Sequence, residues 1–328
     1  MKRFAVVTLV LALALTTLVA GCSTKPKEKV LAKKAALILS GPVNDGGWNQ
    51  NAYEGLQAIK DKDGFEVAVS ENVAQADQVN LMRNYANQGF KYIIANGFEY
   101  GDAIKTVAAE FPKVTFIQLG GIEHNGANAN AMLFKSGEAG YAVGAIAAMM
   151  TKTNKIGWIG AMDIPSIRAD EDNAIAAVKV FNPKAKVIDA YVGSWTDIAK
   201  GKEAALAQIA QGCDIIIANG DAVNHGVAEA VKGTKVGFIG WSRDQTALAP
   251  DNFITSVVQS GAPILLDLVG KGEAGQLKGD LYVMGLVEGA QTLAPYGKIV
   301  PQDIQTKANQ VLKDLKDNKI TLIPPKGS

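Results

Sequence analysis

The stretch Leu37-Ile-Leu-Ser-Gly-Pro-Val-Asn-Asp-Gly-Gly-Trp-Asn-Gln-Asn-Ala-Tyr-Glu-Gly-Leu56 decides the fold of this chain. An apolar run over 35–39 predicts a short buried strand, which Gly41-Pro42 ends, and helical spacing of apolar residues resumes over 51–60. A strand, a loop and a helix in this order are typical of an α/β protein. In such a protein the loop lies at the carboxyl end of a parallel strand, where ligands bind.

The loop in this stretch brings Asn44, Asp45, Trp48 and Asn49 together. Its glycines let the backbone approach a ligand, Trp48 offers a flat apolar face, and Asp45 can accept two hydrogen bonds from one small molecule. We interpret the loop as half of a binding cleft. The alternative is a structural loop, in which Trp48 packs on its own helix and Asp45 caps that helix.

Residues 1–21 indicate a lipoprotein signal peptide. They combine a positively charged start, an apolar stretch over 5–19 and small residues that lead to Cys22. A cysteine in this place accepts a diacylglycerol group, so we expect a lipid anchor on Cys22. The polar residues 22–34 predict a flexible tether. The alternative is an uncleaved membrane helix.

Composition favours a folded protein that does not bind nucleic acid. The net charge of +1 gives no basic face of the kind that nucleic acid requires, and 48% hydrophobic residues in 328 are enough for two cores. Cys213 precedes an apolar run and is expected to be a small buried residue.

From residue 35 onward, strand-like runs alternate with amphipathic stretches, which predicts βαβ units and a parallel sheet. Part of the pattern occurs twice. Gln88-Gly89 and Ile93-Ile-Ala-Asn-Gly97 recur as Gln211-Gly212 and Ile216-Ile-Ala-Asn-Gly220, at a constant offset of 123 positions. The duplication predicts two doubly wound α/β lobes with a ligand crevice between them.

The chain has too few elements after residue 254 for a third domain, so these elements are expected to complete the two lobes. Crossings near Thr255 and Gly285 would make a three-strand hinge. The expected domains are a first lobe over 35–125 plus 255–280 and a second lobe over 126–254 plus 281–322.

Loops at the predicted strand ends carry the candidate ligand-binding residues, which are Asn44, Asp45, Trp48, Asn49, Phe98, Asp163, Trp195, Asp221 and Asp244. Trp48 and Trp195 lie in glycine-flanked loops of opposite lobes and can hold a flat ring between them. Because the loops have no phosphate cradle and Arg243 is their main cation, an uncharged polar ligand fits best. Alternatively, the tryptophans are buried and Asp163 and Asp244 cap helices.

Catalytic motifs are absent from the sequence, which has two histidines, His124 and His225, and no cluster with metal-ligand spacing. We therefore expect no enzyme activity, no metal and no cofactor.

Five stretches resemble the basic membrane protein family, the lipoprotein substrate-binding components of ABC importers that include purine-nucleoside receptors. They are Asn44–Gly55, Gly137–Gly140, Gly160–Pro165, Gly193–Ala204 and Gly240–Gln245. The resemblance implies the type I periplasmic-binding fold with a three-strand hinge and a nucleoside in the cleft.

Carried over by position, the resemblance gives roles to individual residues. Trp48 and Trp195 stand where the family usually has stacking phenylalanines, Asp45 and Asn49 where base contacts lie, and Asp244 where a carboxylate takes ribose hydroxyls. Gln259-Ser260 stands where the family often has a lysine that helps to hold the ribose.

We therefore expect an extracytoplasmic, lipid-anchored monomer that closes over a nucleoside, a purine nucleoside first of all, and presents it to an ABC permease and ATPase. Three alternatives stay open. The ligand is a nucleobase, a flavin or a sugar, the protein is an extracytoplasmic nucleoside hydrolase, or it is a sensor.

Overall fold

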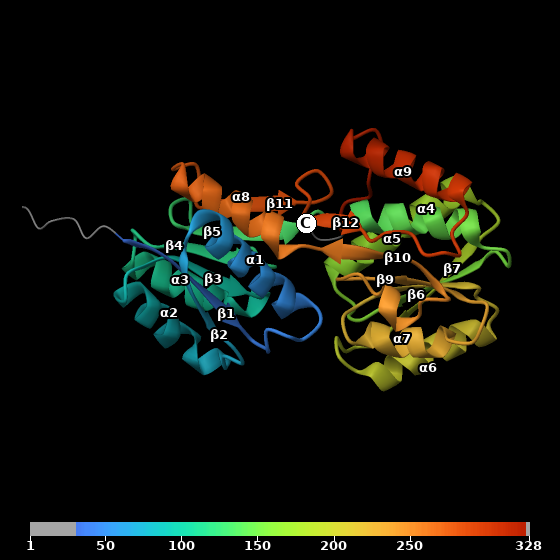
Figure 1. The fold of residues 1–328 in the computed structure, drawn as a ribbon, viewed down its shortest axis with the longest axis horizontal. Helices are drawn as coiled ribbons and strands as arrows, with labels where there is room; N and C mark the ends of the chain where they lie inside the picture. The colour runs from blue at the N-terminus through green and yellow to red at the C-terminus, as the bar shows by residue number, and fades with distance from the viewer. Residues whose placement is uncertain (1–30, 326–328) are drawn as a thin grey trace, which may run out of the picture. The chain divides into compact units, whose positions relative to one another are not determined.

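The computed structural model describes residues 31–325, which contain two six-stranded sheets (Figure 1). The first sheet has the order β11-β5-β4-β3-β1-β2, with every neighbouring pair parallel. Its strands are β1 (Ala32–Leu39), β2 (Glu66–Ser70), β3 (Phe90–Asn96), β4 (Thr115–Leu119), β5 (Ala129–Phe134) and β11 (Leu281–Met284).

The second sheet has the order β12-β10-β9-β8-β6-β7. It is parallel except at its edge, where β12 pairs antiparallel with β10. Its strands are β6 (Lys155–Gly160), β7 (Lys186–Tyr191), β8 (Ile215–Asn219), β9 (Gly237–Gly240), β10 (Phe253–Gln259) and β12 (Gln291–Leu293).

Helices cover both faces of the first sheet, because its central strands are apolar on both sides. Leu56 and Leu265 belong to the core beneath α1 (Trp48–Asp63) and α8 (Gly261–Glu273). Met82 and Ile104 belong to the core on the opposite face, beneath α2 (Gln78–Asn87) and α3 (Gly101–Glu110). Short 3₁₀ helices, η1 (Gln75–Asp77) and η2 (Phe98–Tyr100), precede α2 and α3. We call this unit the first lobe.

The second sheet is covered in the same way. One core lies beneath α4 (Glu138–Met150), α5 (Pro165–Phe181) and α9 (Gln302–Lys316), and it contains Trp158 and Trp241, which pack edge to face. The other core lies beneath α6 (Ile198–Ala210) and α7 (Val223–Val231) and contains Phe238. The 3₁₀ helix η3 (Thr246–Leu248) follows β9. We call this unit the second lobe.

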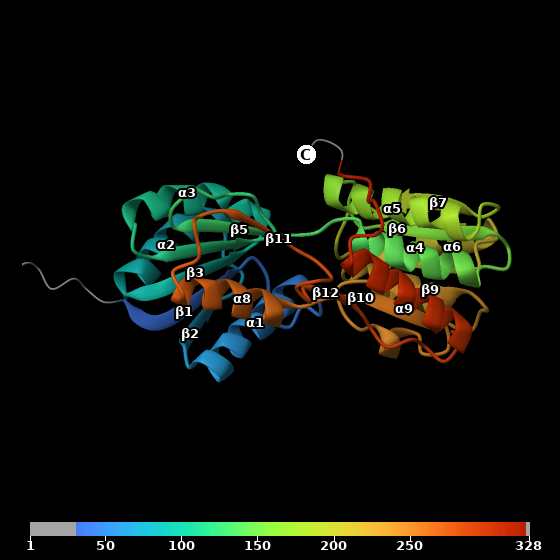
Figure 2. The same ribbon diagram turned by 90° about the horizontal axis from the view of Figure 1, so that it is seen from above.

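The chain passes between the two sheets three times (Figure 2). It leaves the first sheet after β5, returns from β10 through α8 to β11, and leaves again between β11 and β12. The expected fold class, two mostly parallel α/β lobes joined by three connections, is confirmed. The buried position of Cys213 is confirmed as well.

The sheets divide the chain at other residues than we expected. β5 (Ala129–Phe134) and β11 (Leu281–Met284) extend the first sheet although we expected them in the second lobe, and β10 (Phe253–Gln259) belongs to the second sheet although we expected most of it in the first lobe. Each crossing follows a strand that first completes its own sheet, so the boundary lies after that strand. β1 begins at Ala32, so Ala32–Lys34 belong to a strand and not to the tether.

The predicted signal peptide and Cys22 lie outside the described residues. Within 31–325, no helix combines the length and the apolar character needed to cross a membrane.

Candidate functional site

The loop between β1 and α1 is organised by the carboxylate of Asp45. This carboxylate accepts hydrogen bonds from the backbone N–H groups of Gly47, Asn49 and Gln50 at 2.9–3.0 Å, and from Asn49 Nδ2 at 2.9 Å. Asn49 and Gln50 belong to the first turn of α1 and Gly47 is its N-cap, and the helix itself offers these N–H groups no partners. Asp45 is therefore a helix cap, as the structural interpretation of the loop required, while Asn44 next to it is exposed.

Trp48 forms part of the wall of the first lobe. Its ring is half-buried and packs edge to face against Phe134, with centroids 6.1 Å apart. Gly120 has a positive φ of 72° and lies under the ring, because a Cβ added there would be 2.7 Å from Trp48 Cζ2. The buried Asn96, at the end of β3, donates to the carbonyl oxygen of Trp48 and to Asn49 Oδ1, both at 3.3 Å.

Phe98 lies on η2 at the end of the same sheet and is 80% exposed. The backbone beneath it is fixed by the buried Gln118. Gln118 Nε2 donates to the carbonyl oxygens of Gly97 and Phe98, and its Oε1 accepts from the N–H of Glu123. The loop is therefore held in place while its aromatic ring is uncovered.

Trp195 lies in the loop between β7 and α6 of the second lobe, and 39% of it is exposed. Its carbonyl oxygen accepts a hydrogen bond of 3.2 Å from the N–H of Val223 at the start of α7. Asp197 ends this loop as the N-cap of α6, where it accepts from the N–H of Lys200. Trp195 is thus attached to the segment that carries Asp221.

Asp221 of the second lobe lies close to Gly47 of the first lobe. It follows β8 in the second lobe, and its Oδ1 accepts a hydrogen bond of 2.8 Å from Ser242 Oγ. A Cβ added at Gly47 of the first lobe would lie 2.7 Å from this oxygen. Burial raises the pKa of Asp221, and the nearby Asp45 carboxylate raises it further, although the bond from Ser242 opposes both effects.

Asp244 is exposed in the loop after β9. Its Oδ1 accepts hydrogen bonds from the N–H and the hydroxyl of Thr246, at 2.9 and 2.6 Å. Asp244 therefore binds the first residue of η3 from the position before the N-cap Gln245, which is close to the structural alternative for this residue.

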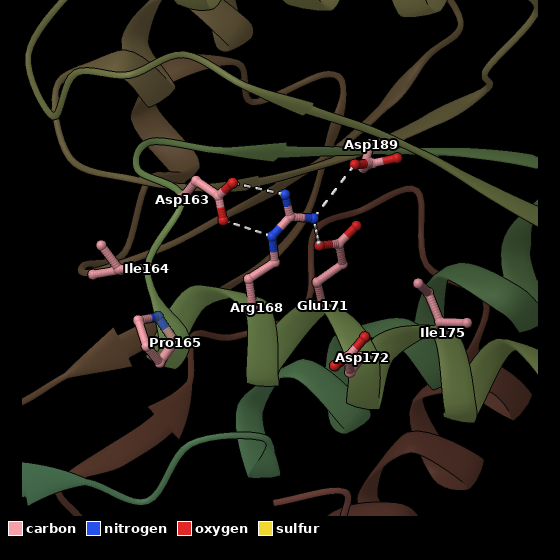
Figure 3. Close-up of a pocket in the computed structure, with 8 residues that line it drawn as sticks. All are labelled: Asp163, Ile164, Pro165, Arg168, Glu171, Asp172, Ile175 and Asp189. Atoms are coloured by element: carbon pink, nitrogen blue, oxygen red, sulfur yellow. Dashed lines mark hydrogen bonds and ion pairs between the residues drawn. The ribbon is translucent and has the colours of Figure 1, made fainter. Parts of the chain in front are cut away.

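Asp163 lies in a hollow of about 460 Å³ (Figure 3). Arg168 donates two hydrogen bonds to Asp163, at 2.7 and 3.0 Å, and one of 3.2 Å to Glu171, and it stacks on the ring of Tyr191. The pKa of Asp163 is lowered by this bonding. The residues that line the hollow all come from the second lobe: Asp163, Ile164, Pro165, Arg168, Glu171, Asp172, Ile175 and Asp189. The carboxylate of Asp163 is therefore already hydrogen-bonded to a residue of its own lobe, Arg168.

Sequence reasoning missed a second contact between the lobes. Asn51 Nδ2, on α1, donates to the carbonyl oxygen of Ser242 at 3.2 Å, and Arg243 donates to Asn51 Oδ1 at 2.8 Å and to Glu54 Oε1 at 2.9 Å. Arg243 stood out in the sequence as the main cation of the loops. Nothing in the local sequence indicated its partners, Asn51 and Glu54, which lie almost two hundred positions earlier.

Metal binding finds no support among the described residues, since no group of three His, Cys, Asp or Glu side chains is arranged to hold an ion.

With this geometry established, comparison with known proteins identifies the family. Residues 32–322 match the model of the Bmp family, described as ABC transporter substrate-binding protein PnrA-like. The chain belongs to this family. The resemblance seen in the sequence is thereby confirmed.

Two curated relatives support the same family assignment. The chain is 29% identical to the ABC transporter nucleoside-binding protein BmpA of Lactococcus lactis, over 98% of this chain and 99% of the relative. It is 30% identical to a purine-binding protein of Brucella abortus, over 92% of this chain and 85% of the relative.

Solved structures show the same fold. A solute-binding protein of an ABC transporter system from Conexibacter woesei has a TM-score of 0.75 at 26% identity, covering 88% of this chain and 98% of that chain. A transcriptional activator of the comK gene from Bacillus halodurans has a TM-score of 0.80 at 22% identity, with coverage of 88% and 99%. The second likeness concerns the fold alone.

Membership of the Bmp family makes this chain a substrate-binding protein of an ABC transporter. Such proteins act outside the cytoplasm, hold a small molecule and deliver it to a permease and its ATPase. The relatives from Lactococcus lactis and Brucella abortus are both named for binding.

Proposed function

We propose that this protein binds a nucleoside, and a purine nucleoside first of all, between its two lobes for import. The names of two relatives support this ligand class, one being a nucleoside-binding and the other a purine-binding protein. The proposed contacts are the residues of the strand-end loops: Asn44, Asp45, Trp48, Asn49, Phe98, Asp163, Trp195, Asp221 and Asp244.

One observation carries the proposal: a continuous series of contacts joins the two tryptophan loops. Trp48 follows Gly47, which lies against Asp221 of the other lobe. Two residues beyond Asp221, the N–H of Val223 is bonded to the carbonyl oxygen of Trp195. The loops of both indoles therefore border the same place, and a planar base between two aromatic faces gains about 1–3 kcal/mol by stacking.

The charges of these loops favour a nucleoside over a nucleotide. Arg243, their main cation, already donates to Asn51 and to Glu54. The remaining ionisable groups are carboxylates, such as Asp221 and Asp244, which accept hydrogen bonds from hydroxyl and ring N–H groups and repel a phosphate.

The predicted lipid anchor completes the proposal. We infer that Cys22 carries a diacylglycerol group after removal of residues 1–21, and that the protein works as a monomer on the outer side of the cell membrane. Mass spectrometry of the mature protein tests this, since it would give an N-terminal peptide that begins with a lipid-modified Cys22. An unmodified peptide that begins with Met1 would contradict it.

The ligand is tested by mass spectrometry of the small molecule that co-purifies, followed by calorimetry with nucleosides, nucleobases and nucleoside 5′-monophosphates. We expect a purine nucleoside to bind and its monophosphate to bind at least about a hundredfold more weakly, about 2.7 kcal/mol. Equal binding of the monophosphate, or binding of a sugar or flavin in place of any nucleoside, would contradict the proposal.

Asp244 gives a second test, because its role in binding competes with its role as a cap. Asp244→Ala should weaken nucleoside binding at least about tenfold, or about 1.4 kcal/mol, without unfolding the protein. Asp251→Ala is the matched control, since Asp251 is exposed in the same lobe and pairs only with Lys298 in the described structure. Unchanged affinity in Asp244→Ala would assign this residue to capping alone.

A further inference from the structure

A short segment of the second lobe, Ser242-Arg243, contacts α1 of the first lobe through three hydrogen bonds. Arg243 donates to Asn51 Oδ1 at 2.8 Å and to Glu54 Oε1 at 2.9 Å, and the carbonyl oxygen of Ser242 accepts from Asn51 Nδ2 at 3.2 Å. Asn51 is 6% exposed, so its amide is shielded from water and uses both its donor and its acceptor here. These three bonds join the second lobe directly to the first.

The backbone of this segment is strained. Ser242 has a φ of 70°, which a residue with a side chain rarely adopts, and it is buried. Several bonds hold it in this conformation. Its hydroxyl donates to Asp221 Oδ1 at 2.8 Å, and its carbonyl oxygen accepts from the N–H of Gln259 at 3.1 Å as well as from Asn51. Strain that the surroundings maintain is characteristic of functional segments.

The segment lies beside one of the three connections between the lobes. Gln259 is the last residue of β10, and Gly261 begins α8 on the first lobe. Gly261 packs so closely on α1 that a Cβ there would overlap the carbonyl oxygen of Asn51. Asn51 therefore contacts both the connection and Arg243, and a rotation about this connection would change the distances from Arg243 to α1.

We propose that Ser242-Arg243 is a latch that holds the lobes in the arrangement seen here before any ligand binds. In this arrangement Asp221 lies against Gly47, which places the two tryptophan loops beside each other. The latch thus keeps the binding surfaces together and sets the fraction of molecules that can accept a ligand. Apparent affinity falls in proportion when that fraction falls.

The chemistry of the latch allows it to release. Arg243 is 27% exposed and Glu54 is 49% exposed, so water screens their attraction. The planar guanidinium uses two nitrogens to reach two partners at once, which the single ammonium of a lysine does not reproduce. A latch of this kind holds the lobes weakly in the observed arrangement and still allows them to move apart.

Small-angle X-ray scattering of the ligand-free full chain tests the latch directly. Arg243→Met removes both bonds of the guanidinium but keeps an unbranched side chain. Arg83→Met is the matched control, because Arg83 also makes two hydrogen bonds, both of them to the carboxylate of Glu110 and entirely within the first lobe. We expect a larger radius of gyration for Arg243→Met than for the wild type, an intermediate one for Arg243→Lys, and no change for Arg83→Met.

The outcomes separate the latch from the identity of the ligand. An unchanged radius of gyration in Arg243→Met overturns the latch, and if nucleoside affinity falls all the same, Arg243 acts on the ligand itself. A larger radius of gyration supports the latch even if no nucleoside binds, in which case the proposed ligand fails. If both hold, we expect nucleoside affinity to fall about two- to fivefold in Arg243→Met.

Discussion

Each lobe contains an equivalent pair of packed helices, and the polar groups at the contact between the two helices differ from one lobe to the other. In each lobe, the helix that enters from the other lobe packs on the helix that follows the first strand of the sheet in chain order: α8 on α1, which follows β1, and α4 on α5, which follows β6. A Ser-Gly pair stands at the start of each entering helix, Ser260-Gly261 at α8 and Ser136-Gly137 at α4. Close glycine contacts join both pairs, Gly261 with Asn51 and Gly140 with Asp170.

The polar groups of the two pairs are of different kinds. In the second lobe, the buried Asp170 accepts from the N–H of Gly137 at 2.7 Å, and the buried Glu138 accepts from the N–H of Leu286 and pairs with Lys135, both at 2.8 Å. In the first lobe, the corresponding place is held by the neutral Asn51. The same arrangement of helices therefore has a buried titratable group, Asp170, in the second lobe. In the first lobe it has the neutral Asn51, which binds Arg243.

Substitution of the glycines at these helix contacts should have the largest effect on stability, because it disrupts the packing that the two lobes share. Gly261→Ala and Gly140→Ala each place a methyl group on a backbone carbonyl, so we expect the free energy of unfolding to fall by at least about 2 kcal/mol in each. Gly270→Ala is the control within α8, because a Cβ there meets no atom within 4 Å and alanine favours the helix. Urea denaturation measures all three. Equal stability of Gly261→Ala and Gly270→Ala would contradict the packing of α8 on α1.

The two tryptophans should differ in how much each contributes to stability and to ligand binding. Trp48 packs on Phe134 and over Gly120, so Trp48→Ala should lower the free energy of unfolding by about 2 kcal/mol as well as weaken binding. Trp195 is more exposed, so Trp195→Ala should leave stability within about 0.5 kcal/mol while it weakens nucleoside binding at least about tenfold. Thermal unfolding and calorimetry separate the two effects. A large loss of stability in Trp195→Ala would assign that indole to the core.

The buried carboxyl group of the second lobe should make its stability depend on pH. Burial raises the pKa of Asp170 from 3.8 to about 7, against the effect of bonds from Gly137, Gly140 and Asn219. Because the folded pKa lies above the unfolded one, the stability that this group contributes is complete below about pH 4 and is lost as the pH rises to about 7.

The wild type should therefore lose stability relative to Asp170→Asn over this window, by up to about 1.4 kcal/mol per pH unit. Asn130→Ala is the control from the first lobe. It removes a buried amide that bonds to Phe116 and Gly279, so it should cost stability by an amount that does not vary with pH. Urea titrations between pH 4 and 7 measure both differences. A constant difference between the wild type and Asp170→Asn would show that Asp170 is ionised throughout.

Much of the fold could be predicted from the sequence because local pattern and burial agree. The strand expected over 35–39 lies within β1 (Ala32–Leu39), and the helical spacing over 51–60 lies within α1 (Trp48–Asp63). The repeat that includes Asn96 and Asn219 reflects two equivalent strands, β3 and β8. The run 129–134 was missed as a strand because asparagines and a glycine precede it, and its place in the first sheet depends on pairing with β4 and β11.

The candidate site could be predicted less completely, since local sequence gives residue types but not the partners that they find. The sequence left two roles open for the carboxylates of Asp45, Asp163 and Asp244, contact with a ligand or the capping of a helix. The structure gives each a partner: the start of α1 for the first, Arg168 for the second and Thr246 for the third. Asp221 differs because it meets the opposite lobe at Gly47, a contact between residues that no local pattern connects.

The central claim is that the two lobes hold a planar heterocycle between the loops of Trp48 and Trp195. A crystal structure of the full chain with its bound nucleoside tests it most directly. We predict that the base lies between the two indoles with at least one ring within about 4 Å of its face, and that carboxylates accept from its polar edge and its ribose. A nucleoside whose base contacts neither indole would contradict the account.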